Sequence, residues 1–322
     1  MRVAVIDFSE RDLLAIEQGI QQSEALRAAP IELLSLPVNS ADQTAHSVPC
    51  KHVDYDSISV LLGAPDGLAH WVPLCPTLQW AQSTWAGVAP LVELPHRHYR
   101  LTALKGVFGT AMSEYVFGWL LGLERRIIQR ATSAHWQPQL DGSLAGKRLG
   151  ILGTGSIGHA VAKTAQAFQL EVVGLNSDGR EVTGFERCYP SASIVSFARG
   201  LDYVCALLPA TPASTGLIDR TFLSQLNPNA ILVNAGRGNV IVDEDLLWAL
   251  SDGGLRAAVL DVFRQEPLPA EHPFWGHPKV HITSHTAAPT PGDAAIGVFL
   301  DNLERFCRNQ PLQHAVDFSR GY

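Results

Sequence analysis

The chain has 322 residues, and 46% of them are hydrophobic, so the length favours two domains and the composition suffices for two buried cores. With 24 basic and 31 acidic residues, the formal net charge of −7 argues against a general affinity for nucleic acid or an anionic membrane surface. The five cysteines form no Cys-x-x-Cys pair, which argues against a disulfide framework or a zinc site and favours a cytoplasmic location.

The N-terminal region, including its first residues, reads as folded α/β structure and not as a signal peptide or a membrane span. Four β-prone runs predict a small parallel sheet, with strands at Val3 to Ile6, Ile31 to Leu36, Ile58 to Leu62 and Leu78 to Gln82. A helical spacing over residues 12–26 lies between the first two runs. An apolar pattern from Tyr115 to Ile128 then predicts a helix that connects this unit to the next.

The second half again alternates strands with helices. Six β-prone runs predict a dinucleotide-binding sheet with strands at Leu149 to Leu152, Glu171 to Leu175, Tyr203 to Leu208, Ala230 to Val233, Ala257 to Leu260 and His281 to Thr283. An amphipathic pattern from Ala294 to Phe306 predicts a last helix that returns to the first unit.

A glycine-rich turn joins the first of these runs to a helical pattern over residues 156–168. The turn reads Gly153-Thr154-Gly155-Ser156-Ile157-Gly158, the G-x-G-x-x-G pattern of a dinucleotide-binding βα turn. Gly153 permits the tight turn, Gly155 lets a pyrophosphate approach the backbone, and Gly158 lets the helix pack closely on the strand. The strand and helix on either side favour this interpretation over a glycine-rich turn that binds nothing.

These patterns predict an α/β fold with two Rossmann-like, doubly wound parallel-sheet domains. We expect a discontinuous substrate domain, residues 1–103 plus 290–322, and a dinucleotide-binding domain at residues 104–289 between its two parts.

The residues after the second strand of this unit bear on the choice of dinucleotide. Asn176 stands where an acidic residue would accept hydrogen bonds from the ribose of NAD, and it has no charge to repel a 2′-phosphate. Ser177 can donate a hydrogen bond, and Arg180 can supply a cation. NADP(H) is therefore the preferred cofactor. NAD(H) stays open, because Asp178 would take the acidic role after a small shift of the loop.

Three polar residues follow three consecutive predicted strands: Arg237, Asp261 and His285. Ligands of open α/β sheets bind outside the carboxyl ends of the strands, so all three face the predicted crevice. Reduction of a 2-keto acid needs a cation for the carboxylate and carbonyl, and an acid to protonate the oxygen; Arg237 and His285 are candidates. Glu266 would keep the imidazole charged. Taken singly, each of these residues is more often a solvated charge or a structural histidine.

Several motifs resemble those of the D-isomer-specific 2-hydroxyacid dehydrogenases, particularly the glyoxylate/hydroxypyruvate reductase branch. The resemblance spans most of residues 80–322 and rests on LGTGSIG at 152–158, NAGRG at 234–238, VDE at 242–244, LDVFRQEPLP at 260–269 and HPKVHITSHTAA at 277–288. It implies that Arg237, Glu266 and His285 are the catalytic residues. One departure concerns the cofactor: NADP-preferring members often place an arginine directly after the second strand, where this chain has Asn176-Ser177.

The resemblance implies further roles outside the catalytic residues. Asp261 would contact the nicotinamide carboxamide, and Leu208 and Pro209 would flank the cofactor. The loop Trp85-Ala86-Gly87-Val88 would bind the substrate carboxylate through backbone amides. The family also implies a homodimer joined through the nucleotide domains.

The sequence thus predicts an NADPH-dependent reductase of glyoxylate, hydroxypyruvate or a similar small 2-keto acid. One alternative is an NAD-dependent D-2-hydroxyacid dehydrogenase with another substrate, although Glu266 disfavours a formate dehydrogenase, in which glutamine stands there. The other is a non-catalytic protein that senses a nucleotide and binds a partner. His96 and His98 have no accompanying ligand cluster, so we expect a solvated loop and no metal site.

Overall fold

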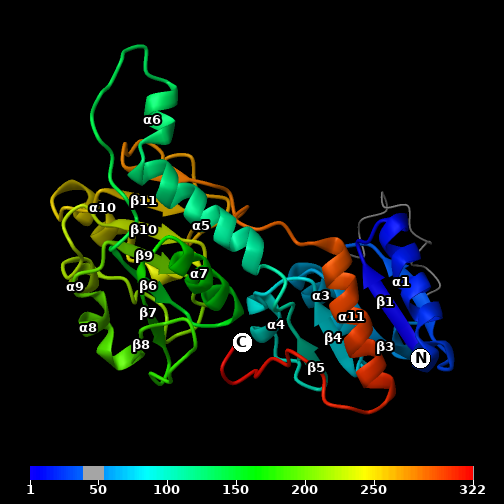
Figure 1. The fold of residues 1–322 in the computed structure, drawn as a ribbon. Coiled ribbons are helices and arrows are strands. Elements are labelled where there is room, and N and C mark those ends of the chain that lie inside the picture. Colours follow the sequence, from blue (N-terminus) through cyan, green and yellow to red (C-terminus); the bar gives the residue numbers. More distant parts are fainter. Residues whose placement is uncertain (39–53, 322) are drawn as a thin grey trace. The chain divides into compact units, whose positions relative to one another are not determined.

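The computed structural model describes residues 1–38 and 54–321, and the chain divides into two compact units (Figure 1). The first unit comprises Met1–Val107 and Thr290–Tyr322, and the second comprises Phe108–Pro289. Each unit has its own parallel sheet, so the predicted fold class, α/β with two Rossmann-like domains, is confirmed. Within the described ranges, no helix combines the length and the apolar character needed to cross a bilayer.

The first unit is built on a five-stranded parallel sheet in the order β2-β1-β3-β4-β5. Its strands are β1 (Arg2–Ile6), β2 (Glu32–Leu36), β3 (Ile58–Gly63), β4 (Trp80–Ser83) and β5 (Arg100–Thr102). Its helices are α1 (Glu10–Gln22), α2 (Glu24–Arg27), α3 (Pro65–Trp71), α4 (Ala89–Val92) and α11 (Gly292–Cys307), with short 3-10 turns η2 (Tyr55–Ser57) and η3 (Val72–Leu74).

Two apolar layers hold this sheet between helices. Ile16 of α1 and Phe299 of α11 pack with Val3 and Val5 on one face, and α3 and α4 cover the other. The ring of Trp80 stacks on Phe299 with their centroids 5.5 Å apart. The prediction that the last helix returns to the first unit is therefore confirmed.

The second unit has a seven-stranded parallel sheet in the order β12-β11-β10-β9-β6-β7-β8. Its strands are β6 (Arg148–Leu152), β7 (Glu171–Asn176), β8 (Arg187–Pro190), β9 (Tyr203–Ala206), β10 (Ile231–Asn234), β11 (Ala257–Leu260) and β12 (Val280–Ile282). Its helices are α5 (Gly109–Glu124), α6 (Ile127–Ala131), α7 (Ser156–Ala167), α8 (Ile194–Ala198), α9 (Arg220–Leu223) and α10 (Asp243–Ser251), with 3-10 turns η4 (Ser191–Ser193) and η5 (Gly238–Val240).

The strand order reverses between β6 and β9, because β7 and β8 extend the sheet in one direction and β9 to β12 extend it in the other. Helices α5 and α7 cover one face, and α8, α9 and α10 cover the opposite one (Figure 1). In such a sheet, the carboxyl ends of the strands on both sides of the reversal open onto one crevice. A ligand is therefore expected at this edge.

Two predicted helices differ from the structure. The pattern over residues 12–26 is divided at Ser23, whose extended backbone ends α1 and whose hydroxyl accepts the amide of Leu26 to cap α2. The pattern over 115–128 begins earlier, at Gly109, and α5 ends at Glu124, because Arg126 adopts a left-handed conformation with φ 51°. This helix packs within the second unit.

Two strands were missed, and the prediction of six strands in the second sheet was wrong by one. Strands β5 and β8 are short, lie at sheet edges and pair only with β4 and β7. Both begin with an arginine and have no long apolar run, so the sequence shows little strand pattern there. Strand β9 ends at Ala206, two residues before the predicted end, and β12 is shifted by one residue.

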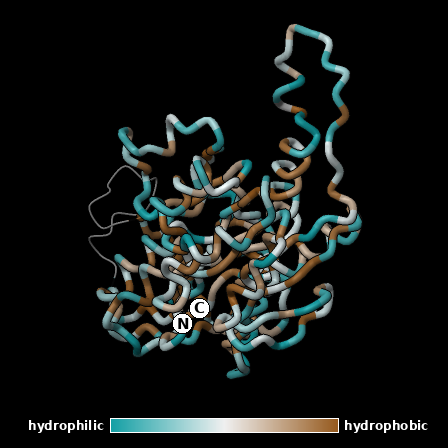
Figure 2. The backbone as a smooth tube through the Cα atoms, turned by 90° about the vertical axis from the view of Figure 1, so that its left-hand side faces the viewer, coloured by the Kyte–Doolittle hydropathy of each residue, from teal (hydrophilic) through white to brown (hydrophobic). Residues whose placement is uncertain are grey.

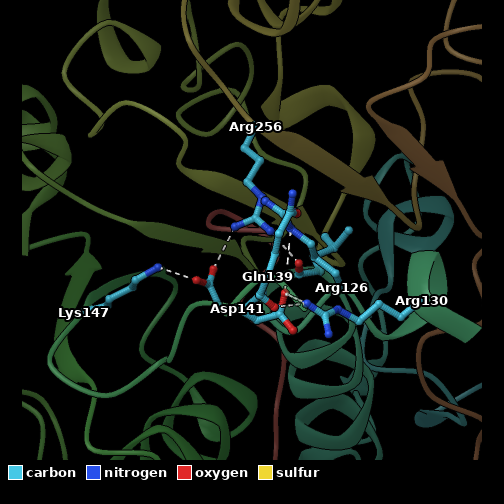
Figure 3. A network of polar contacts seen from close by, with 8 residues as sticks. Arg126, Arg130, Gln139, Asp141, Lys147 and Arg256 are labelled. Carbon is cyan, nitrogen blue, oxygen red and sulfur yellow. Dashed lines mark hydrogen bonds and ion pairs between the residues drawn. The ribbon is translucent and has the colours of Figure 1, made fainter. Parts of the chain in front are cut away.

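A buried carboxylate fixes the end of α5. Glu124 is 4% exposed, and its oxygens lie 2.8 Å from Lys147 Nζ and 3.0 Å from Arg256 Nη1, with Tyr203 Oη donating at 3.0 Å. Burial raises the pKa of Glu124, but the bonds and charges of these three partners outweigh it and hold the pKa below its ordinary value. Figure 3 shows Lys147, just before β6, and Arg256, just before β11, reaching this network.

A projecting segment, residues 125–143, follows this network, and we call it the arm. It includes α6 and rises away from the body of its unit in both views (Figures 1 and 2). At its base Asp141 lies 3.0 Å from Arg130 Nη2 and 3.9 Å from Arg126 Nε, and Figure 3 shows these groups together. Charged groups thus anchor the base of the arm.

Candidate active site

The glycine turn after β6 leaves the start of α7 open. Gly153 has φ 105°, a conformation that favours glycine, and a Cβ at Gly158 would lie 2.0 Å from the carbonyl oxygen of Gly153. Gly155 is the N-cap of α7, no side chain caps the helix, and a Cβ there would meet nothing within 4 Å. The first helical residues, Ser156 and Ile157, therefore offer uncapped amides to an anion.

Asn176, at the end of β7, uses its side chain to shape the following loop. Its amide nitrogen donates to Thr154 Oγ1 at 3.2 Å and to the carbonyl of Arg180 at 2.9 Å, and its oxygen accepts the amide of Gly179 at 2.6 Å. The residue is 7% exposed. Asn176 thus fixes the loop that bears the residues expected to contact the ribose end.

Within this loop, Arg180 is paired with the competing acidic residue. Arg180 Nη1 lies 3.0 Å from Asp178 Oδ1, and the side chains are 58% and 60% exposed. The backbone amide of Arg180, followed by its guanidinium, holds the pKa of Asp178 below its ordinary value. Ser177, beside them, is exposed as well. A cation and a carboxylate therefore share the position that the sequence predicts to distinguish the two dinucleotides.

The segment after β9 passes between two glycine turns at the carboxyl edge of the sheet. A Cβ at Gly153 would lie 3.1 Å from the carbonyl oxygen of Leu207, and one at Gly236 would lie 2.8 Å from the amide of Leu208. Pro209 follows directly. Leu208 and Pro209 accordingly lie at the edge where the strand order reverses.

Arg237 follows β10 in a turn that a buried asparagine holds. Asn234 is fully buried and donates to the carbonyl oxygen of Arg237 at 3.0 Å, and Arg237 Nη1 donates to the carbonyl of Gly236 at 2.7 Å. Burial lowers the pKa of Arg237, while the charge of Glu266 acts in the opposite direction. Within the described residues, no carboxylate forms an ion pair with this guanidinium, so it is suited to an anionic ligand.

Asp261 follows β11 and is 1% exposed. Its carboxylate accepts hydrogen bonds from the hydroxyl of Thr283 at 2.5 Å, from the amide of Thr286 at 2.8 Å and from the amide of Ala287 at 3.0 Å. Its backbone oxygen accepts the amide of His285 at 2.8 Å. Asp261 therefore holds the loop on both sides of His285.

His285 follows β12 and faces Glu266. The Nδ1 atom of the imidazole lies 2.8 Å from Glu266 Oε2, and both side chains are 38% exposed. The other carboxylate oxygen of Glu266 accepts the amide of Phe263 at 2.8 Å, which fixes its orientation. His285 has φ 55°, a left-handed conformation that only a few per cent or so of residues other than glycine adopt.

The structure thus brings Arg237, Asp261 and His285 to the ends of three adjacent strands, β10, β11 and β12. Glu266 comes to the same edge from the loop after β11. A guanidinium beside an imidazole–carboxylate pair can hold an anion and exchange one proton.

The predicted substrate loop lies in the first unit, after β4, and is described apart from the residues above. The amide and carbonyl of Trp85 both bond the hydroxyl of Ser83 at 3.0 Å, and the amide of Leu104 donates to the same carbonyl. Trp85 is 41% exposed and Val88 is buried, while Ala86 and Gly87 lie between them.

Two residues that shape the site were missed from the sequence. Thr283 supports the carboxylate of Asp261, and Asn234 holds the turn that bears Arg237. A signal was available for both, because each stands at or next to the end of a predicted strand that leads to a candidate residue. Only their hydrogen bonds show which neighbours they hold.

A family model described as "D-isomer specific 2-hydroxyacid dehydrogenase, NAD binding domain" matches residues 117–287, more than half of the chain. Among relatives, glyoxylate/hydroxypyruvate reductase A of Yersinia enterocolitica is 34% identical over 214 residues, which cover 66% of this chain and 68% of the relative. The protein of the same name from Escherichia fergusonii is 34% identical over 217 residues, covering 66% of this chain and 70% of that protein.

Solved structures agree over nearly the whole chain. A D-isomer specific 2-hydroxyacid dehydrogenase family protein from Aeromonas salmonicida has a TM-score of 0.83 and 35% identity, with 98% of this chain and 99% of that chain covered. An NADPH-dependent glyoxylate/hydroxypyruvate reductase from Sinorhizobium meliloti, in complex with NADP and sulfate, has a TM-score of 0.80 and 28% identity, with 100% and 99% covered.

The glycine turn yields a prediction with a built-in control. In Gly155→Ala the new methyl group meets no protein atom within 4 Å, so we expect the urea midpoint to stay unchanged. We expect the affinity for the dinucleotide to fall about tenfold or more, because the methyl group keeps the pyrophosphate away from the backbone. In Gly158→Ala the methyl group clashes with Gly153, so stability falls by about 1–3 kcal/mol. Urea unfolding and fluorescence titration with NADPH measure both; undiminished NADPH binding by Gly155→Ala would contradict the assignment.

Proposed function

The chain belongs to the D-isomer specific 2-hydroxyacid dehydrogenase family, and we propose that it reduces a small 2-keto acid, glyoxylate or hydroxypyruvate, with NADPH. The single observation that supports this chemistry most strongly is the 2.8 Å contact between His285, which follows β12, and Glu266, in the loop after β11, at the edge of the sheet where Arg237 follows β10. The names of the reductase relatives support the substrate class.

Arg237 is the group that we assign to the substrate carboxylate and carbonyl oxygen. Its guanidinium is partly withdrawn from water, and one of its N–H groups is held by the carbonyl of Gly236. The others can bind two oxygens of a 2-keto acid side by side. Charge that develops on the carbonyl oxygen during reduction is stabilised at this cation.

His285 is the proton donor in this proposal, and Glu266 is its partner. With Nδ1 directed to the carboxylate of Glu266, the Nε2 side of the ring is the one that meets the carbonyl oxygen of the substrate. The carboxylate keeps the imidazole in one orientation, as the amide of Phe263 keeps the carboxylate itself. In the oxidative direction the same imidazole accepts the proton of the hydroxyl group.

The residues of the glycine turn fit a dinucleotide, because the space above Gly155 is open and α7 begins without a side-chain cap. When bound, the reduced nicotinamide supplies the two electrons of the reduction. The pyrophosphate would be held by the glycine turn and the start of α7, at Gly153, Gly155, Ser156, Ile157 and Gly158. The 2′-phosphate would be bound by Ser177 and Arg180, and the cofactor would be flanked by Leu208 and Pro209. Asn176 shapes the loop that bears Ser177 and Arg180, and Asp261 holds the loop that bears His285.

We further propose that the second unit is the dinucleotide-binding domain and the first unit the substrate domain. The glycine turn in the second unit supports the first assignment. The loop Trp85-Ala86-Gly87-Val88 after β4 supports the second: Trp85 and Ala86 are exposed, and the amides that follow Trp85, whose own amide bonds Ser83, would donate to the substrate carboxylate. The described cysteines are Cys75, Cys188, Cys205 and Cys307, all free thiols, which supports the proposed cytoplasmic location; Cys50 lies outside the described residues.

The homodimer is also a proposal, and the arm supports it. Trp136 is 93% exposed and Leu140 is 97% exposed, although the ion pairs at the base of the arm hold it in place. A second copy of the chain would cover these apolar side chains.

The activity is tested with NADPH and a panel of 2-keto acids, followed by absorbance. We expect glyoxylate or hydroxypyruvate to be reduced, and His285→Ala to lower kcat by about 100-fold or more while the KM for NADPH changes less than about twofold. His277→Asn, three residues before the start of β12, is the matched control and retains the activity. A wild-type protein that binds NADPH and oxidises it with none of these acids would refute the proposal.

The preference for NADPH is tested at the exposed pair. Asp178→Asn removes a carboxylate that competes for Arg180 and repels a 2′-phosphate, so the KM for NADPH falls by about two- to fivefold, the range of an exposed ion pair. The KM for NADH serves as the internal control and does not fall. Equal changes for both dinucleotides would place Asp178 and Arg180 outside the 2′-phosphate site.

The dimer is tested by light scattering. The double variant Trp136→Ser, Leu140→Ser loses the apolar contact and has half the molar mass of the wild type, whereas Trp275→Ser, at another exposed tryptophan, keeps the wild-type mass. A monomeric wild type at micromolar concentration would exclude this role of the arm.

A further inference from the structure

Tyr115, on helix α5, contacts one of the residues that hold the loop of His285. Its hydroxyl lies 2.8 Å from Thr283 Oγ1, and Thr283 lies 2.5 Å from the carboxylate of Asp261. We propose that Tyr115 is a positioning residue, which acts through Thr283 and Asp261 to hold the loop that bears His285. The proposal rests on the proposed function for its catalytic consequence.

The direction of the hydrogen bonds follows from counting protons. The hydroxyl of Thr283 has one hydrogen, and it donates this hydrogen to the carboxylate of Asp261. Tyr115 must then donate to Thr283. The result is one continuous chain of donors from Tyr115 through Thr283 to the buried carboxylate.

The surroundings of Tyr115 maintain this direction. Burial raises the pKa of Tyr115 to about 12, so the phenol keeps its proton throughout the range in which the enzyme is assayed. Its ring meets Trp119 edge-on at 6.5 Å, and Trp119 lies 5.1 Å from the ring of His281 in β12. The aromatic side chains of α5 therefore pack against the strand that leads to His285.

The loop needs such support because His285 has an uncommon backbone conformation, with φ 55°. Asp261 accepts the amides of Thr286 and Ala287, and its backbone accepts that of His285. Thr283 gives the carboxylate its only side-chain donor among the described residues. A loss of order at Thr283 is therefore transmitted through Asp261 to the position of the imidazole.

The catalytic test is a double-mutant cycle of Tyr115→Phe and Thr283→Val. Tyr115→Phe keeps the ring and removes only the hydroxyl, and we expect kcat to fall about tenfold with the KM for NADPH changed less than about twofold. Because both residues act along one chain, the double variant is no slower than Thr283→Val alone. Thr283→Ser, which keeps a hydroxyl, restores at least half of the wild-type kcat.

Hydrogen exchange gives a readout that does not depend on activity. In Tyr115→Phe the amides of residues 285–287 exchange about tenfold faster than in the wild type, since their acceptor is less firmly held. Tyr203→Phe is the matched control: it removes a buried, bonded phenol from the same unit, lowers stability, and leaves both kcat and these amides within about twofold.

Additive effects in the cycle, unchanged exchange at residues 285–287, or the same loss of kcat in Tyr203→Phe would each overturn the role of Tyr115. If the wild type reduces none of the 2-keto acids, the proposed function fails while the exchange experiment still decides whether Tyr115 holds the loop.

Discussion

The buried carboxylate of Asp261 is the constraint on which the rest of the site depends. Burying a carboxylate away from water costs on the order of several kcal/mol unless hydrogen-bond donors surround it. Thr283, Thr286 and Ala287 supply those donors, and in doing so they fix the loop that bears His285. These donors offset the cost of burying the carboxylate, and they hold in place the residue that we propose to exchange the proton, His285.

The topology of the second sheet explains why the glycine turn after β6 lies at the same edge as Arg237, Asp261 and His285. All seven strands are parallel, so the turns after β6, β9, β10, β11 and β12 leave the sheet on the same side. Glycines at 153, 158 and 236 let these turns approach one another at distances that a side chain would prevent. Backbone amides and charged side chains can then meet ligands at one edge.

Sequence patterns predicted the interior strands and the long helices, because buried parallel strands need continuous apolar runs and a surface helix needs an apolar stripe. Strands β5 and β8 escaped prediction because pairing with a neighbour, not their own composition, makes them strands. The two helix boundaries at Ser23 and Arg126 depend on a hydroxyl cap and a left-handed residue, to which hydrophobic spacing is insensitive.

By itself, the sequence determined the fold class, the glycine turn and the edge of the sheet that bears Arg237, Asp261, Glu266 and His285. Local patterns predict where strands end, and parallel strands have their carboxyl ends at one edge. Only the tertiary structure decided that Asn176 shapes its loop, that Arg180 is paired with Asp178, and that Tyr115 joins the support of Asp261. The bond between Tyr115 and Thr283 joins residues 168 positions apart, so it exists only after α5 has packed on the sheet. The bonds of Asn176 and Arg180 are local, but they depend on the backbone path of the loop after β7, which hydrophobic patterns do not encode.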